Sequence, residues 1–97
     1  MIVEIADITI QPGKAGEFAA AIKRGVETVI AHAPGYRNHR ILHGIESPER
    51  FVLLICWDSV AAHNEGFRKS PAFGEWRAIV GPYFDGPPKV EHFDFVD

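Results

Sequence analysis

Four segments of the chain have the composition of β-strands, and two have the spacing of helices. β-Branched and aromatic residues, or an alternation of charged and bulky side chains, predict strands at 2–10, 36–45, 51–57 and 89–96. Apolar residues recur every three or four positions between 17 and 32, and again between 60 and 80. Ser70-Pro71 divides the second helical segment in two, because Ser caps a helix and Pro fits its first turn.

The segment 51–57, Phe-Val-Leu-Leu-Ile-Cys-Trp, is the most apolar in the chain. It has no polar face, which predicts a central strand that is buried on both sides. Neither face of the segment 2–10 is cleanly polar, which predicts that both of its faces are at least half covered. Gly25 lies on the apolar stripe of the first helix, where it costs about 1 kcal/mol relative to Ala. This position favours a close approach of that helix to a sheet.

The order β-α-β-β-α-β is that of a ferredoxin-like α+β fold, and it predicts a single domain over residues 1–97. Such a fold has a four-stranded antiparallel sheet with two helices on one face. Right-handed crossovers give the expected strand order 4-1-3-2. The helices cover only one face, while the other face also carries apolar residues. We therefore expect a homodimer that pairs these sheet faces about a two-fold axis.

Composition and charge narrow the class of protein. The 97 residues are 46% hydrophobic and 24% charged, with a net charge of -3, which argues against nucleic-acid binding and against a polybasic membrane patch. No apolar run approaches the roughly 20 residues that span a bilayer. The single cysteine, Cys56, excludes an internal disulfide framework and a zinc ribbon. The first residues lack the pattern of a signal peptide, so we expect a cytoplasmic protein.

Several short motifs, taken in order, resemble the antibiotic biosynthesis monooxygenase (ABM) family of small dimeric α+β barrels. They are Pro12-Gly13-Lys14, Pro34-Gly35-Tyr36, Trp57-Asp58-Ser59, the run from Phe67 to Phe73, and Pro82-Tyr83-Phe84. The resemblance implies this fold and a dimer. It leaves the activity open, because the family includes cofactor-free quinone-forming oxygenases, haem-degrading enzymes and relatives that process quorum signals.

Two departures from the family pattern bear on the chemistry. Haem-degrading members carry an Asn in the first strand and a haem-binding His in the second helix, where this chain has Ala6 and Arg77. Many members also carry a Glu two residues before the Trp, where this chain has Ile55. The resemblance therefore disfavours haem degradation and gives no support for a cofactor.

Cofactor-free oxygenation needs a base, a donor for an oxyanion and a dry aromatic pocket. His63 is the candidate base, since the start of a helix favours a neutral imidazole, and Trp57 offers an indole N–H. The expected substrate-binding residues are Phe67, Arg68, Trp76, Tyr83 and His92. The same residues also fit plainer roles: Trp57 and Trp76 in packing, Arg68 in solvent, and His63 at a surface cap.

Nucleotide sites are not expected, and neither is a metal site within one subunit, while a metal bound by histidines of two subunits stays open. His39 and His43 lie four residues apart on a strand, about 13 Å, which is too far for one zinc ion. The chain has no HExxH, CxxC or phosphate-loop pattern. The leading hypothesis is a cofactor-independent monooxygenase that acts on a small phenolic or quinonoid, polyketide-like aromatic compound. The alternatives are a non-catalytic ligand-binding or stress-related dimeric α/β barrel, and an isomerase or decarboxylase-type enzyme with His63 as its base.

Overall fold

Four antiparallel strands form one sheet with the order β2-β3-β1-β4 in the computed structural model, which describes residues 1–97. Their bounds are β1 Ile2–Thr9, β2 Tyr36–His43, β3 Arg50–Trp57 and β4 Lys89–Phe93. This is the predicted order, read from the other edge. β1 and β3 occupy the centre, as their apolar sequences predict.

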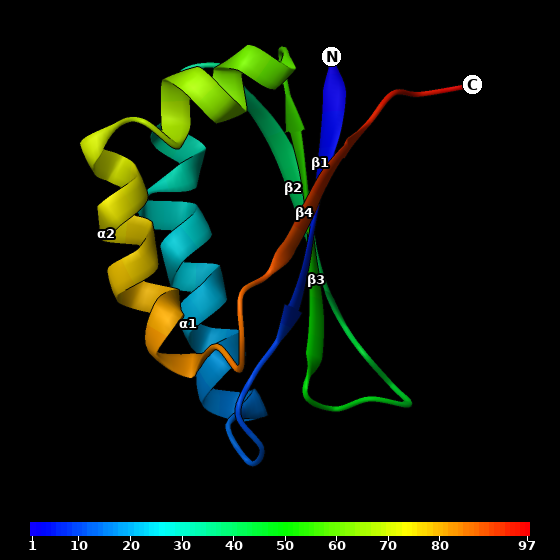
Figure 1. Ribbon diagram of the computed structural model, residues 1–97, viewed down its shortest axis with the longest axis vertical. Helices are drawn as coiled ribbons and strands as arrows, with labels where there is room; N and C mark the ends of the chain where they lie inside the picture. Colours follow the sequence, from blue (N-terminus) through cyan, green and yellow to red (C-terminus); the bar gives the residue numbers. More distant parts are fainter.

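Two helices, α1 (Ala15–Thr28) and α2 (Pro71–Val80), lie on the same side of the sheet (Figure 1). The predicted ferredoxin-like α+β fold is confirmed. The core fills the space between the two layers. Its fully buried side chains alternate along the strands and follow one face of each helix: Ile8, Phe51, Leu53, Ile55, Phe18, Ile22, Val26 and Val80.

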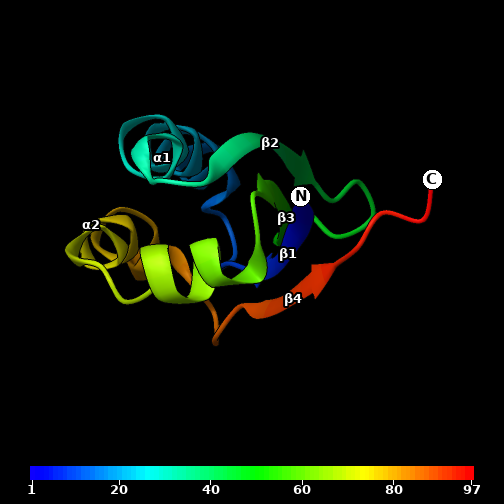
Figure 2. The ribbon, with the colours of Figure 1, turned by 90° about the horizontal axis from the view of Figure 1, so that it is seen from above.

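The second helical segment is divided as expected, but its first part is not an α-helix. Residues Ala62–Phe67 form a π-helical turn, in which the amide of Arg68 donates to the carbonyl of His63 at 2.9 Å. Ser59 caps this turn through a 3.1 Å hydrogen bond from the amide of Ala62. Figure 2 shows the turn crossing the end of the sheet where β1 begins and β3 ends. Such wide turns occur often at functional sites.

The close approach predicted at Gly25 is made to a helix and not to the sheet. A Cβ atom at Gly25 would lie 2.8 Å from the ring of Trp76 on α2. The glycine therefore lets α1 and α2 come together over the sheet. The prediction named the wrong neighbour because an apolar stripe does not say which of two layers it packs against.

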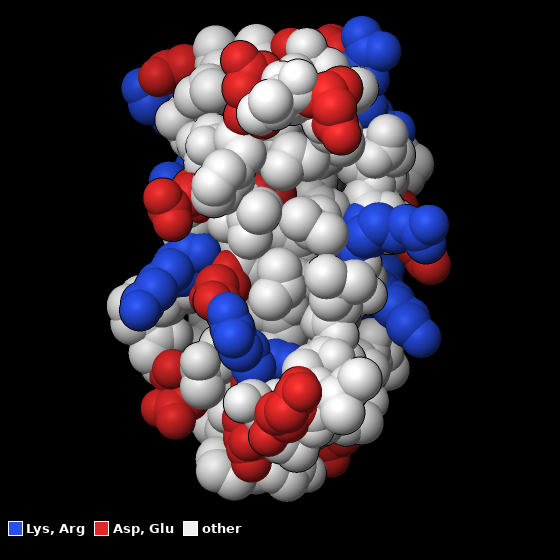
Figure 3. Space-filling view, turned by 90° about the vertical axis from the view of Figure 1, so that its right-hand side faces the viewer, with Lys and Arg blue, Asp and Glu red and all other residues white.

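The sheet face opposite the helices carries an uncharged central strip, with charged side chains gathered toward its edges (Figure 3). Val3, Ile5 and Leu54 on this face are only partly covered. Leu42 and Phe93 are 49% and 44% exposed. An apolar strip of this kind is left open by the single chain. None of the helices is long and apolar enough to cross a membrane.

Candidate active site

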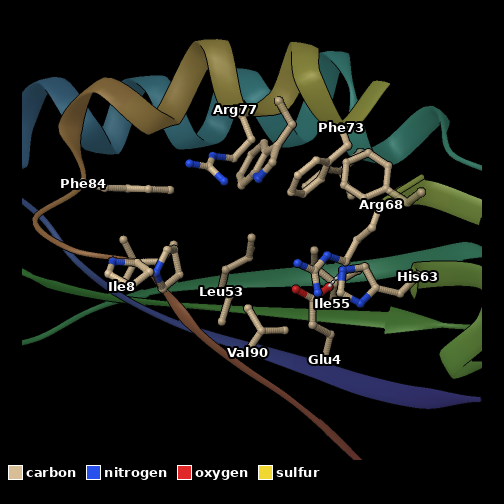
Figure 4. A pocket seen from close by; sticks show the side chains of 16 residues that line it. Glu4, Ile8, Leu53, Ile55, His63, Arg68, Phe73, Arg77, Phe84 and Val90 are labelled. Carbon is tan, nitrogen blue, oxygen red and sulfur yellow. Dashed lines mark ion pairs between the residues drawn. The ribbon is translucent and has the colours of Figure 1, made fainter. Parts of the chain in front are cut away.

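A cavity of about 170 Å³ lies between the sheet and α2. Figure 4 shows it closed at one end by Phe84, with Glu4 and His63 at the other end. Apolar side chains form most of the rest of its wall: Ala6, Ile8, Ile30, Leu53, Ile55, Phe67, Phe73, Trp76, Pro87, Pro88 and Val90. A dry cavity of about 150 Å³ holds a benzene ring. The space therefore suits a compound with one aromatic ring.

Glu4 is a carboxylate on the helix-facing side of β1, where the alternating neighbours Ala6 and Ile8 are apolar. It is only 5% exposed. Its Oε1 accepts a 2.9 Å hydrogen bond from the indole N–H of Trp57 and lies 3.3 Å from Nε2 of His63. Its Oε2 has no hydrogen bond within the chain and is not completely covered. Oε2 is thus the oxygen available to a molecule in the cavity.

Burial shifts the pKa values of Glu4 and His63 in opposite directions. Burial raises the pKa of Glu4 from 4.5 to about 7, against the opposing effects of the Trp57 hydrogen bond and the Arg68 charge. Burial, together with the charges of His92 and Arg68, lowers the pKa of His63 from 6.5 to about 4. At neutral pH His63 is therefore neutral, and its 3.3 Å contact with Glu4 is not an ion pair. Glu4 is the group that changes its charge near pH 7.

His92 lies on the edge strand β4, directly opposite Glu4 in the register of the sheet. Its Nε2 is 2.8 Å from Nδ1 of His63. His92 is partly exposed, whereas His63 is only 4% exposed. The chain has no group of three His, Cys, Asp or Glu side chains that could hold a metal ion. Glu4, His63 and His92 instead direct their polar atoms at one another.

Arg68 and Arg77 bring two positive charges to the cavity wall. Their guanidinium groups lie 5.6 Å and 6.0 Å from the ring centroid of Phe73, and Arg77 also lies 5.6 Å from that of Phe84. Neither forms an ion pair with a carboxylate of the chain. These cation–π contacts hold the charges over aromatic rings and leave them free for an anion.

The structure brings four of the expected site residues to the cavity wall: His63, Phe67, Arg68 and Trp76. Three others lie elsewhere, for different reasons. Trp57 is fully buried beside His63, with its ring stacked on the imidazole at 5.3 Å and its N–H already donated to Glu4. Tyr83 packs edge-on against Phe18 at 5.7 Å. His92 contacts His63 and does not line the cavity.

Glu4 was missed by the sequence analysis, as were the wall residues Phe73 and Phe84. A signal for Glu4 was present. It is the single charged residue among Ile2, Ala6, Ile8 and Ile10, the positions of the same parity on β1. Since that face packs under the helices, a carboxylate there is held out of water at a cost. Such a residue is a better candidate for a perturbed acid than a histidine on a helix.

The sequence of this chain is similar to one protein family over most of its length. The family model described as "Antibiotic biosynthesis monooxygenase" matches residues 1–79, a span that includes Glu4, Trp57 and His63 but ends before His92. The uncharacterized protein YczJ of Bacillus subtilis (strain 168) is 32% identical over 96 residues, which are 99% of this chain and 100% of YczJ.

Solved structures agree with this match. A protein of Bordetella bronchiseptica that carries the same family name is 37% identical, with a TM-score of 0.92 over 98% of this chain and 96% of the other. SnoaB, described as a cofactor-independent oxygenase from Streptomyces nogalater, is 17% identical, with a TM-score of 0.82 over 99% of this chain and 93% of its own. At that identity SnoaB establishes a shared fold.

Proposed function

The chain belongs to the antibiotic biosynthesis monooxygenase family, and on this basis we propose that it is a cofactor-independent monooxygenase that converts a small, one-ring phenol or hydroquinone into a quinone. The family and its relatives support monooxygenation in general terms. The observation that carries the finer proposal is Glu4. A buried carboxylate with a pKa of about 7 and one free oxygen faces a cavity the size of one ring.

The reaction begins with proton transfer from the phenol to Glu4. A general base works best when its pKa is close to the working pH, which Glu4 satisfies and His63, with a pKa of about 4, does not. The role of base, first assigned to His63, therefore passes to Glu4. The phenolate is electron-rich and reduces dioxygen by one electron, and recombination of the two forms a C–O bond at a ring carbon.

The remaining steps balance without a further reductant. Glu4 returns its proton to the terminal oxygen of the peroxide. It then removes the hydrogen of the same ring carbon, whose electron pair becomes the C=O bond as the O–O bond breaks. The departing hydroxide takes that proton from Glu4 and leaves as water. A phenol and O₂ thus become a quinone and water, and Glu4 ends as it began.

The other wall residues supply binding and charge stabilisation. Arg68 lies at the end of the cavity with Glu4 and His63, where a phenolate oxygen would form. Arg77 projects into the cavity from α2, where it would face the peroxide (Figure 4). Positive charges held beside a developing anion stabilise it, and Arg68 and Arg77 do so from exposed positions of the single chain. The rings of Phe67, Phe73 and Trp76 provide faces on which the substrate ring packs.

The same proposal includes a cytoplasmic homodimer that pairs the sheet faces opposite the helices. Val3, Ile5 and Leu54 form the centre of this face, and each is only partly covered in the single chain. Pairing two copies of one patch about a two-fold axis covers both at once.

Oxygen uptake with a panel of one-ring phenols and hydroquinones tests the function. We expect uptake matched by quinone formation, and a loss of about 10²–10⁴ in rate for Glu4→Gln. Glu75→Gln, an exposed change on α2, is the matched control and keeps the full rate. Product formation without oxygen uptake would assign the site to an isomerase or decarboxylase instead. Binding without turnover would favour the ligand-binding alternative.

A further inference from the structure

Three side chains from three separate segments place their polar atoms in a continuous line, with one hydrogen bond, between His63 and His92, and one close contact, between Glu4 and His63. Glu4 comes from β1, His63 from the π-helical turn and His92 from the edge strand β4. The distances are 3.3 Å from Glu4 Oε1 to His63 Nε2, and 2.8 Å from His63 Nδ1 to His92 Nε2. We propose that this line is a proton relay, through which Glu4 exchanges its proton with solvent while a ligand fills the cavity.

The relay has two states that differ by one proton. When Glu4 is ionised, His63 donates its Nε2–H to Oε1 and accepts at Nδ1 the Nε2–H of His92. When Glu4 is protonated, its O–H donates to Nε2 of His63, and Nδ1–H of His63 donates to Nε2 of His92. To pass from the second state to the first, each ring gains a proton on one nitrogen and loses one from the other. One proton leaves through Nδ1 of His92 to water.

The surroundings of Glu4 leave this as its route to water once the cavity is occupied. Glu4 and His63 are 5% and 4% exposed, and Trp57 beside them is 0% exposed. Trp57 is no second route, because an indole N–H donates but cannot accept a proton. Its hydrogen bond is made to Oε1. A half-turn of the terminal bond of Glu4 exchanges the two oxygens at the Trp57 N–H, so a proton received at Oε2 reaches the relay.

The neighbouring charged groups do not titrate in the same range. Arg68 and Arg77 stay charged at all relevant pH values. Tyr36 lies on the far side of Trp57, and burial raises its pKa above 10. Asp7 and Glu91 project from the opposite face of the sheet. A change of tautomer at His63 near neutral pH therefore reports on Glu4.

The first test uses the free protein labelled with ¹⁵N in its histidines and followed by NMR from pH 5 to pH 9. We expect His63 to carry its proton on Nε2 at high pH and on Nδ1 at low pH, with a midpoint near that of Glu4. Scalar coupling across the hydrogen bond should link its Nδ1 to Nε2 of His92. In Glu4→Gln, the amide oxygen that accepts from Trp57 also faces Nε2 of His63, so His63 should keep its Nε2–H at every pH. A single tautomer throughout in the wild-type protein, or no coupling between the rings, overturns the relay.

The second test measures turnover of a substrate from the oxygen-uptake panel. The role of the relay in turnover rests on the proposed function. The NMR test needs no substrate, so the relay and the proposed function can fail separately. The proposed reaction returns each proton within the cavity, so the relay is needed where substrate binds over a protonated Glu4, below pH 7. His92→Gln keeps a hydrogen-bonding side chain but passes no proton, so we expect a loss of about 10-fold in rate at pH 6, restored by added imidazole, and little loss at pH 8. His39→Gln is the control, because His39 is also a partly buried strand histidine with a partner, Tyr36. An unchanged rate of His92→Gln at pH 6, or a loss there that imidazole does not restore, leaves His92 a structural role and overturns the relay.

Discussion

Replacing Glu4 by Gln should change how the stability of the protein depends on pH. Gln keeps the size of the side chain and an oxygen that accepts the Trp57 N–H, but it does not ionise. In the wild-type protein, folding favours the protonated form of Glu4, because burial raises its pKa from 4.5 to about 7. The wild-type fold therefore loses stability as the pH rises between these two values, and Glu4→Gln does not.

The size of the effect follows from the two pKa values of Glu4. Each pH unit between 4.5 and about 7 costs the wild-type fold about 1.4 kcal/mol, or about 3 kcal/mol in all. His63 has the opposite effect. Its pKa is lowered from 6.5 to about 4, so its contribution rises with pH over that window. The two slopes nearly cancel in the wild-type protein. His63 is present in both proteins and drops out of the difference between them.

The assay is urea unfolding followed by circular dichroism at pH 4.5, 6 and 8, at one protein concentration. The free energy of unfolding of Glu4→Gln minus that of the wild-type protein should rise by about 3 kcal/mol from the lowest pH to the highest. For the exposed control Glu75→Gln, the same difference should change by less than about 0.5 kcal/mol. A flat difference for Glu4→Gln, or one that falls with pH, would show that Glu4 is not a carboxyl with a raised pKa.

Three further changes test other parts of the structure. Trp57→Phe removes the hydrogen bond that lowers the pKa of Glu4, so we expect that pKa to rise further. Urea unfolding should show a free energy of unfolding lower by about 1–3 kcal/mol, with the larger loss at pH 8 and the smaller at pH 5. Gly25→Ala gains about 1 kcal/mol of helix propensity but forces a methyl group to within 2.8 Å of the buried ring of Trp76, so we expect a lower melting temperature. A higher melting temperature would contradict the close packing of α1 and α2. Leu54→Glu places a charge at the centre of the outer sheet face, so the mass measured by sedimentation should fall from twice that of the chain to that of one chain. Ala78→Glu, on the exposed side of α2, is the control, and the same fall in mass there would contradict a dimer through the sheet.

The fold was predictable because each of its signals extends over many residues. The apolar run of β3, the β-branched composition of β1 and the helical stripe from Phe18 onward each contain several consistent positions, so one ambiguous residue does not change the outcome. The division at Ser70-Pro71 was equally clear, since both residues have strong preferences at a helix start. These are local properties of the chain.

The site was harder to predict because it depends on contacts between distant segments. His63 and Phe67 were expected at the wall, and both line the cavity. Nothing local indicates that the N–H of Trp57 points at Glu4, 53 residues away, or that His92 reaches His63 across 29 residues. The π-helical turn was also invisible, because its hydrogen bond spans five residues in a segment whose apolar spacing fits an ordinary helix.

The cavity has two kinds of wall, and they come from different parts of the chain. The proton-handling group of Glu4, His63 and His92 gathers at the end of the sheet, where His63 contacts Glu4 at 3.3 Å and forms a 2.8 Å hydrogen bond with His92. Phe73 and Phe84 project from α2 and the turn after it, and neither bonds to that group. Mutation at these positions therefore reshapes what the protein admits while the acid–base machinery stays intact. A lineage built on this scaffold can exchange one substrate for another in small steps, each of which keeps a working centre.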